Sequence, residues 1–129
     1  AARGIDGRKY PWGNLFNLYI DGFTVHANID SDELMPVGYF PTGVSLYDVY
    51  NLTGNVSEWI DDWYALDYYT QSSKNNPKGP ETGKFRILRG GSWRNRNDCN
   101  VMISNRAYQL PDYSSNFVGF RCVLSKSMK

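Results

Sequence analysis

The sequence predicts an α+β domain with little regular secondary structure. Its 129 residues include ten Tyr, six Phe and four Trp beside twelve Gly and six Pro, a mixture typical of a loop-rich fold with an aromatic core. The strand candidates are short, and turns with Gly or Pro separate them throughout the chain. Short strands joined by long loops favour an α+β architecture over a helical bundle.

The length and charge of the chain limit its function class. A chain of 129 residues fits a single domain over residues 1–129. The formal net charge of +1 gives no strong field that selects nucleic acid or an anionic membrane. No apolar run approaches the roughly 18 residues that cross a bilayer, and the N-terminus lacks the layout of a signal peptide. We therefore expect no nucleic-acid partner and no direct membrane span.

The N-terminal part contains turns and one strand candidate. Ala1 to Gly4 resembles the frayed end of a helix, because Gly commonly follows a last helical turn. Tyr10 to Asn14, "YPWGN", predicts a turn, since Pro11 makes its predecessor extended and Gly13 permits positive φ. Phe23 to Ile29 mixes aromatic and β-branched residues, which indicates a short strand or an ordered loop.

The middle of the chain carries the one helix candidate. In "NLTGNVSEWIDDWY", Asn51 to Tyr64, four large apolar residues recur near helical spacing. This pattern predicts a turn followed by one or two helical turns. The next segment rich in Gly, Pro and Asn, "NNPKGPETG" at Asn75 to Gly83, predicts a surface turn.

Three strand candidates follow this turn. Lys84 to Leu88 begins with alternating basic and apolar residues and stops before Gly90 and Gly91. Asn100 to Tyr108 and Phe117 to Val123 are the other two, and "LPDYSSN" is the turn between them.

Several chemistries find no support in the motifs. "GPETGKF", Gly79 to Phe85, has three residues between its glycines, not the four of a phosphate loop, and Phe85 replaces the Ser or Thr that holds magnesium. His26 is the single histidine, so neither a zinc cluster nor a Ser/His or Cys/His catalytic pair is indicated. The arginines between Arg86 and Arg96 lie partly on a predicted strand, whose alternate residues point to opposite faces. Their closeness in sequence therefore does not by itself predict one basic patch for nucleic acid.

Oxygen ligands for a hard cation are better represented. Asn51, the carbonyl groups of Gly54 and Val56, and Glu58 lie close together in a tight turn, and calcium takes six to eight such oxygens. The alternative is a capped helix start with Glu58 facing solvent. "NIDSDE", starting at Asn28, is a second carboxylate-rich loop of similar character.

Two cysteines leave two alternatives open. Cys99 and Cys122 either form one disulfide or remain two free buried thiols. A bridge would close a loop of about 24 residues and contribute on the order of 3 kcal/mol.

Four segments together resemble, in order and spacing, the domain of formylglycine-generating enzymes, also called the sulfatase-modifying-factor domain. They are "AARGIDGRKYPWGN", "PVGYFPTGVSLYDVYNLTGNVSEWIDDWY", "NPKGPETGKFRILRGGSW" and "NRAYQLPDYSSNFVGFRCV". The resemblance covers nearly the whole chain, and its GGSW and GFRC elements are specific. It implies a C-type-lectin-like fold of the formylglycine-generating-enzyme type, with bound calcium in many members.

The resemblance also implies the calcium ligands. The first site corresponds to Asn51, Gly54, Val56 and Glu58. A second corresponds in part to Asn28 and Ile29, with Asp30, Asp32 or Glu33 as its acidic ligand.

Catalytic members of the family oxidise a substrate cysteine with copper held between two thiolates. The resemblance places these two cysteines three and eight residues after the Ser of the GGS motif. Ser92 matches that serine, but the two positions hold Asn95 and Asn100. An amide cannot replace a thiolate on soft Cu(I), and Cys99 reaches the second position only with a one-residue slip. The Trp expected before Glu58 is also missing. We therefore expect no copper and no formylglycine formation by the known mechanism.

Two further branches of the fold offer alternatives. The related domain of sulfoxide synthases works beside an iron centre of three histidines, which His26 alone cannot supply. Variable proteins of diversity-generating retroelements display a hypervariable segment between GGSW-like and GFR-like frames. Residues Arg94 to Asn116 have the Asn, Arg, Tyr, Ser and Asp composition of such a binding surface. Its candidate ligand or partner residues are Trp93, Arg94, Asn95, Arg96, Asn97, Tyr108 and Tyr113.

The sequence thus predicts a non-catalytic binding or scaffold module, such as an accessory subunit of a larger assembly. The alternatives are an oxidase or sulfoxide synthase completed by a missing segment or partner, and a retroelement variable protein. Domains of this family carry a substantial segment before "AARG". We therefore expect that the chain continues in a longer polypeptide, or that a protein partner covers its exposed core. The compartment stays open, with an extracytoplasmic one favoured.

Overall fold

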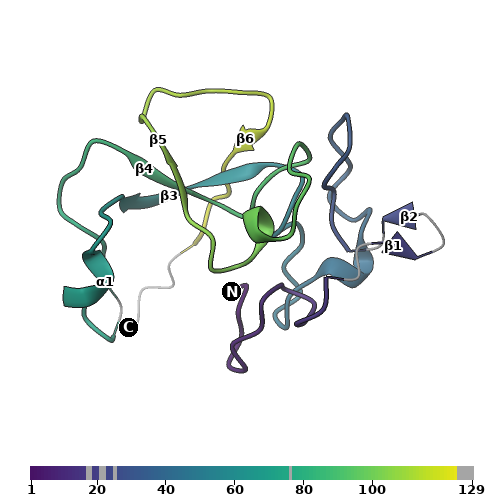
Figure 1. The fold of residues 1–129 in the computed structure, drawn as a ribbon, viewed down its shortest axis with the longest axis horizontal. Coiled ribbons are helices and arrows are strands. Elements are labelled where there is room, and N and C mark those ends of the chain that lie inside the picture. The colour runs from purple at the N-terminus through teal and green to yellow at the C-terminus, as the bar shows by residue number, and fades with distance from the viewer. Residues whose placement is uncertain (17–18, 21–22, 25, 76, 125–129) are drawn as a thin grey trace.

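The centre of the structure is a four-stranded sheet with the strand order β5-β4-β3-β6 (Figure 1). Its strands are β3 (Ser57–Trp63), β4 (Arg86–Arg89), β5 (Ala107–Gln109) and β6 (Val118–Gly119). β3 pairs antiparallel with β4, β4 pairs antiparallel with β5, and β6 runs parallel to β3. The computed structural model describes residues 1–16, 19–20, 23–24, 26–75 and 77–124.

The other elements are short. β1 (Tyr19–Ile20) and β2 (Phe23–Thr24) form a separate two-stranded ladder. Two 3-10 turns, η1 (Pro41–Gly43) and η2 (Cys99–Val101), and the four-residue helix α1 (Tyr68–Gln71) complete the set. Loops make up most of the described chain, as predicted for an α+β fold with little regular structure.

The helix predicted after residue 51 is wrong, because this segment is the central strand β3. Trp59 and Ile60 pair with successive residues of β4, and the register then shifts before Trp63 pairs with Arg86. Such a bulge adds residues to one strand only. The irregular spacing of the large side chains therefore comes from a bulged strand. Pairing with β4 along the strand, and with β6 at its first two residues, overrides the local helical pattern.

The other strand predictions are confirmed only in part. The candidate at 84–88 becomes β4, shifted toward Arg89. Within 100–108 only the end is a strand, because the chain first forms η2 and then a turn in which the Asn105 N–H donates to the Met102 carbonyl at 2.9 Å. The candidate at 117–123 contributes only β6. That at 23–29 divides into β2 and a buried loop at 27–29, with Val25 outside the described residues.

The predicted turn at residues 10–14 is confirmed. Tyr10 and Gly13 exchange two backbone hydrogen bonds of 2.9 and 3.1 Å. The helix end predicted at residues 1–4 is wrong, since these residues form no helical turn, although Gly4 has the positive φ of 59° that such an end uses. Residues 75–83 form a loop as predicted, of which Asn76 lies outside the described residues.

A small core lies beside the sheet and is partly aromatic. Tyr10, Ala27, Ile29 and Val101 are buried, with Val101 at 0% exposure. The Tyr10 ring stacks on Trp12 with ring centroids 5.2 Å apart. The Ile103 N–H donates to the Lys9 carbonyl at 2.9 Å, which ties the N-terminal turn to the segment after η2.

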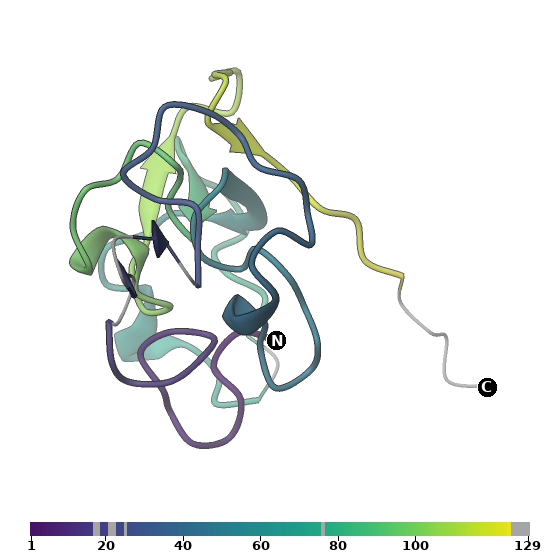
Figure 2. The ribbon, with the colours of Figure 1, turned by 90° about the vertical axis from the view of Figure 1, so that its right-hand side faces the viewer.

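Many large apolar side chains stay outside this core. Ile5, Leu66 and Phe120 are strongly exposed, and Leu124 is exposed at 98%. Figure 2 shows the described residues after β6, 120–124, extending outward from the sheet. Among the described residues, no helix is long and apolar enough to cross a membrane.

Candidate functional site

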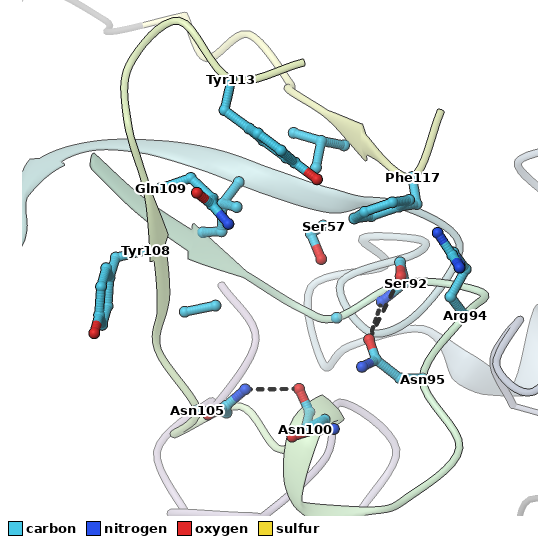
Figure 3. Close-up of a pocket in the computed structure, with 14 residues that line it drawn as sticks. Ser57, Ser92, Arg94, Asn95, Asn100, Asn105, Tyr108, Gln109, Tyr113 and Phe117 are labelled. Atoms are coloured by element: carbon cyan, nitrogen blue, oxygen red, sulfur yellow. Dashed lines mark hydrogen bonds between the residues drawn. The ribbon is translucent and has the colours of Figure 1, made fainter. Parts of the chain in front are cut away.

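A pocket of about 300 Å³ lies against the sheet (Figure 3). It is found where residues 110–117 connect β5 to β6, a connection that arches over the sheet in Figure 1. We call it the ligand pocket. Strands supply its floor and three loops supply its walls. Its lining residues are Ser57, Leu88, Gly91, Ser92, Arg94, Asn95, Asn100, Asn105, Ala107, Tyr108, Gln109, Tyr113, Phe117 and Val118.

The double glycine after β4 shapes one wall of the pocket. Gly90 and Gly91 have φ of 87° and 69°, a left-handed conformation that glycine adopts without strain. A Cβ on Gly91 would lie 2.6 Å from a methyl group of Val101. The tight turn lets the N–H of the buried Ser92 donate to Asn95 Oδ1 at 2.7 Å. The glycine turn and this hydrogen bond thus hold Ser92 and Asn95 in the wall of the pocket.

The two positions at which the family resemblance implies copper-binding cysteines both line this pocket, but here they hold asparagine side chains. Asn95 and Asn100 both line it, and the Asn100 carbonyl accepts a hydrogen bond of 2.8 Å from Asn105 Nδ2 (Figure 3). Cys99 is exposed, is not among the described lining residues, and its thiol donates to Asn97 Oδ1 at 3.4 Å. The one-residue slip that would bring Cys99 into the second position does not occur in this structure.

The predicted binding surface divides between two hollows. Arg94, Asn95 and Tyr113 line the ligand pocket. Trp93 and Arg96 line a polar hollow of about 470 Å³, which also includes Arg94. Its other lining residues are Asp30, Ser31, Asp32 and Asn116.

Asn97 has a structural role at the start of η2. Its Oδ1 accepts from the Cys99 thiol and from the Asn100 N–H. It is not among the described residues that line either hollow.

Tyr108 differs from the other predicted surface residues, because its ring points away from the centre of the pocket (Figure 3). It stacks on Tyr64 with centroids 4.1 Å apart and contacts Phe85 at 5.1 Å. Tyr108 pairs with Ile87 in the ladder, whereas Ala107 pairs with Leu88. Neighbouring residues of a strand face opposite sides, so Ala107 and Gln109 share the Leu88 side and Tyr108 does not.

Several pocket residues were not predicted from the sequence. Ser57 and Val118 pair across β3 and β6, and Phe117 precedes that pair. The Phe117 ring lies 6.4 Å from that of Tyr113 at the top of the pocket (Figure 3). The alternation of side chains along a strand predicts that Ser57 faces the pocket, but only once residues 57–63 are recognised as a strand.

The first predicted calcium loop holds a cation that belongs to the protein. Arg121 forms an ion pair with Glu58, in which Arg121 Nε donates to Glu58 Oε2 at 2.6 Å. Arg121 Nη2 donates to Glu58 Oε1 and to the carbonyl oxygens of Tyr50 and Asn51, at 3.1 and 3.2 Å for the two carbonyls. Carboxylate and carbonyl oxygens are also what calcium requires. This donor set fits a cation, but calcium has to displace Arg121 to use it.

The neighbouring residues of this loop adopt an uncommon backbone. Asn51, Gly54 and Asn55 have φ of 52°, 76° and 63°. A Cβ on Gly54 would lie 2.5 Å from the carbonyl oxygen of Asn28. Asn51, Asn55, Val56 and Glu58 line one hollow of about 490 Å³ together with Arg121. The loop therefore brings the predicted Asn51, Val56 and Glu58 together, and Gly54 provides the close approach that the loop needs.

The second predicted calcium loop is already tied to the protein through Asn28. Its buried side chain donates to the Glu33 carbonyl at 2.8 Å and to Asn55 Oδ1 at 3.0 Å, and it accepts from the Ser31 hydroxyl at 2.6 Å. The Ile29 side chain belongs to the core. The part of the chain that the structure describes contains no group of three or more His, Cys, Asp and Glu residues placed to hold a metal. Calcium at Asn28 and Ile29 stays a prediction.

The structure contains neither the disulfide nor the two buried thiols that were the predicted alternatives for the cysteines. Cys99 and Cys122 are free, and both are exposed rather than buried.

Comparison with known proteins agrees with the segments singled out above. The sulfatase-modifying factor enzyme 1-like domain matches residues 1–126. The formylglycine-generating enzyme of Thermomonospora curvata is 37% identical over 95% of this chain and 45% of its own length. The inactive C-alpha-formylglycine-generating enzyme 2 of Mus musculus is 34% identical over 97% of this chain and 40% of its own length. The chain spans less than half the length of these relatives.

Solved structures share the fold. PvdO from Pseudomonas aeruginosa matches with a TM-score of 0.72 at 24% identity, over 92% of this chain and 46% of that chain. Treponema denticola variable protein 1 matches with a TM-score of 0.60 at 27% identity, over 74% of this chain and 34% of that chain. These neighbours confirm a C-type-lectin-like α+β fold. The chain belongs to the family of the sulfatase-modifying factor enzyme 1-like domain.

Proposed function

We propose that this chain is a non-catalytic binding module whose ligand or protein partner enters the ligand pocket. One observation carries the proposal. Asn95 and Asn100 both line the pocket at the positions that resemblance gives to the copper thiolates, while Cys99 lies outside. Carboxamides are poor ligands for Cu(I), but they donate and accept hydrogen bonds. The pocket is therefore suited to recognition.

The lining of the pocket supports a binding role. Carboxamides of Asn95, Asn100, Asn105 and Gln109 surround an apolar floor, and aromatic rings lie at the top. Adaptable amides beside rigid aromatic rings are typical of binding surfaces. A volume of about 300 Å³ is at the lower end for small-molecule sites and suits one or two side chains of a partner.

A scaffold role within a larger assembly follows from the exposed apolar side chains. Ile5, Leu66 and Phe120 lie on the surface of a chain that spans less than half the length of its relatives. Large apolar surfaces are normally covered by a partner or by the rest of a domain. We infer that a protein partner, or further polypeptide, packs on this chain.

Calcium at the first oxygen-rich loop is part of the proposal. Asn51, Gly54, Val56 and Glu58 are its proposed ligands. The loop already surrounds the positive charge of Arg121 with carboxylate and carbonyl oxygens, which is the environment a calcium ion needs. Calcium here is structural, since the loop leads into the central strand β3.

Cu(I) titration tests the absence of copper chemistry. Under anaerobic, reducing conditions, the protein competes with a chromophoric Cu(I) chelator. We expect the wild-type protein to leave the chelator loaded, and Cys99→Ser to behave the same. The double variant Asn95→Cys, Asn100→Cys is the positive control, because it places two thiols in the pocket. Tight Cu(I) binding by the unmodified protein that disappears in Cys99→Ser contradicts the proposal and favours an oxidase.

A second candidate function is display of a variable ligand surface. Residues 94–116 supply more than half of the side chains that line the ligand pocket, and the chain matches Treponema denticola variable protein 1. Sequencing of gene copies from sibling cells tests this candidate. Differences concentrated at the pocket positions of 94–116 support it, and identical copies remove it.

A further inference from the structure

Arg89, the last residue of β4, lines a pocket that shares no lining residue with the ligand pocket. We call it the Arg89 pocket. Its volume is about 440 Å³. Its lining residues are Ala1, Ala2, Arg3, Tyr69, Arg89, Ile103 and Ser104.

The guanidinium of Arg89 has no carboxylate partner within ion-pair distance among the described residues. The arginines that do form ion pairs there are Arg8, Arg86, Arg96 and Arg121. Glu58 lies opposite Arg89 across the β3–β4 ladder, but its carboxylate binds Arg121. The hydrogen-bond partner of Arg89 is a neutral group, the Asn105 carbonyl, which accepts from Nη1. A guanidinium has five N–H donors, so most of its capacity remains.

The lining of the Arg89 pocket suits an anion. Its lining residues include Arg3, whose side chain carries a second guanidinium, and Tyr69 and Ser104, whose side chains carry hydroxyl groups; no Asp or Glu is among the described lining residues. Burial is the main cause that lowers the pKa of Arg89; the like charge of Arg106 acts in the same direction, whereas Tyr69 and Asp62 act in the opposite one. Among the described residues, no carboxylate comes within ion-pair distance of this guanidinium.

We propose that the Arg89 pocket binds a small oxyanion: a carboxylate, sulfate or phosphate group held between the Arg89 and Arg3 guanidinium groups. The planar fork of a guanidinium matches two oxygens of such a group. The Tyr69 and Ser104 hydroxyl groups supply further donors. This site is independent of the proposed role of the ligand pocket.

Thermal unfolding with added salts tests the site. Sodium sulfate, phosphate and acetate are titrated into the full chain, with sodium chloride at matched ionic strength as the reference. We expect at least one oxyanion to raise the melting temperature saturably above the chloride reference. A rise with acetate shows that a carboxylate is sufficient, and a rise with sulfate and phosphate alone assigns the site to tetrahedral dianions. Equal responses to all salts overturn the proposal.

Variants locate the effect. Arg89→Gln is expected to abolish the specific rise, and Arg3→Gln to increase the half-saturating concentration about tenfold, as expected for one charge-assisted contact. Arg3 is exposed, so its variant keeps the test valid if Arg89→Gln fails to fold. Arg96→Gln, which removes a guanidinium exposed at 84%, is the matched control and is expected to respond as wild type. A wild-type response in Arg3→Gln and in Ser104→Ala refutes the site.

Discussion

Glu58 lies directly opposite Arg89 in the β3–β4 ladder, yet its carboxylate binds Arg121 from the segment after β6. Arg121 and Glu58 are 63 residues apart in the sequence. Through Arg121, the C-terminal GFRC element is tied to the start of the central strand and to the loop at Tyr50 and Asn51. This one guanidinium therefore connects three segments, and it leaves Arg89 without its cross-strand partner.

Substitution of Arg121 tests this connection. Arg121→Gln removes the charge that faces a carboxylate with only 15% side-chain exposure, and it removes hydrogen bonds to two carbonyl groups. We expect a loss of about 2 kcal/mol in the free energy of unfolding, because hydrogen bonds to charged groups contribute about 1.5–3 kcal/mol. Urea denaturation measures it. Arg96→Gln is the control, since its exposed ion pair with Asp30 contributes less than about 1 kcal/mol. Equal losses in both variants contradict the assignment.

Calcium is expected to rescue that variant. With Arg121 replaced by Gln, Glu58 and the two carbonyl oxygens lose their cation, and calcium can take its place. We predict that calcium raises the melting temperature of Arg121→Gln more than that of the wild-type protein, because no guanidinium competes. Glu58→Gln combined with Arg121→Gln serves as the control and is expected to lose the response. If calcium raises the melting temperature of the double variant by the same amount, the ion binds elsewhere.

Gly43 is predicted to tolerate no side chain. It is buried in η1, and a Cβ there overlaps the backbone carbonyl of His26. Gly43→Ala is therefore expected to cost more than about 3 kcal/mol in the free energy of unfolding or to prevent folding. Gly38→Ala provides the comparison, because no atom lies within 4 Å of the added Cβ. We expect a change within about 0.5 kcal/mol there. Circular dichroism during denaturation distinguishes the two, and similar stabilities place the His26 carbonyl elsewhere.

The pH response of Asp6 follows from its contact with Arg8. The side-chain hydrogen bond from Arg8 lowers the pKa of Asp6 from 3.8 to about 2. A carboxyl group with a lowered folded-state pKa adds stability above its unfolded pKa, and this contribution disappears as pH falls from about 4 through about 2. NMR titration of the Asp6 carboxyl carbon is expected to show a midpoint near 2, which returns toward 3.8 in Arg8→Gln. Arg3→Gln should leave the midpoint in place; a shift there points to a diffuse charge effect.

Features that depend on a few consecutive residues were predictable from the sequence alone. The turn at Tyr10 to Gly13 follows from Pro11 and Gly13, and its two backbone hydrogen bonds confirm it. The GGS turn likewise requires residues that adopt positive φ, and it carries Ser92 and Asn95 into the pocket. The family and its α+β fold were also evident from motifs. Each turn signal is complete within a few residues, and the family signal consists of four segments spread along the chain.

The tertiary structure decided the features that depend on distant partners. Residues 57–63 form a strand because β4 pairs along them and β6 pairs with the first two. Tyr108 turns away from the pocket because its register with Ile87 sets its face. Arg121, not a metal ion, meets Glu58 because the parallel pairing of β6 with Ser57 and Glu58 places Arg121, two residues further on, beside the start of β3. Ladder register and charge pairing are settled between segments far apart in sequence, so no local pattern contains them.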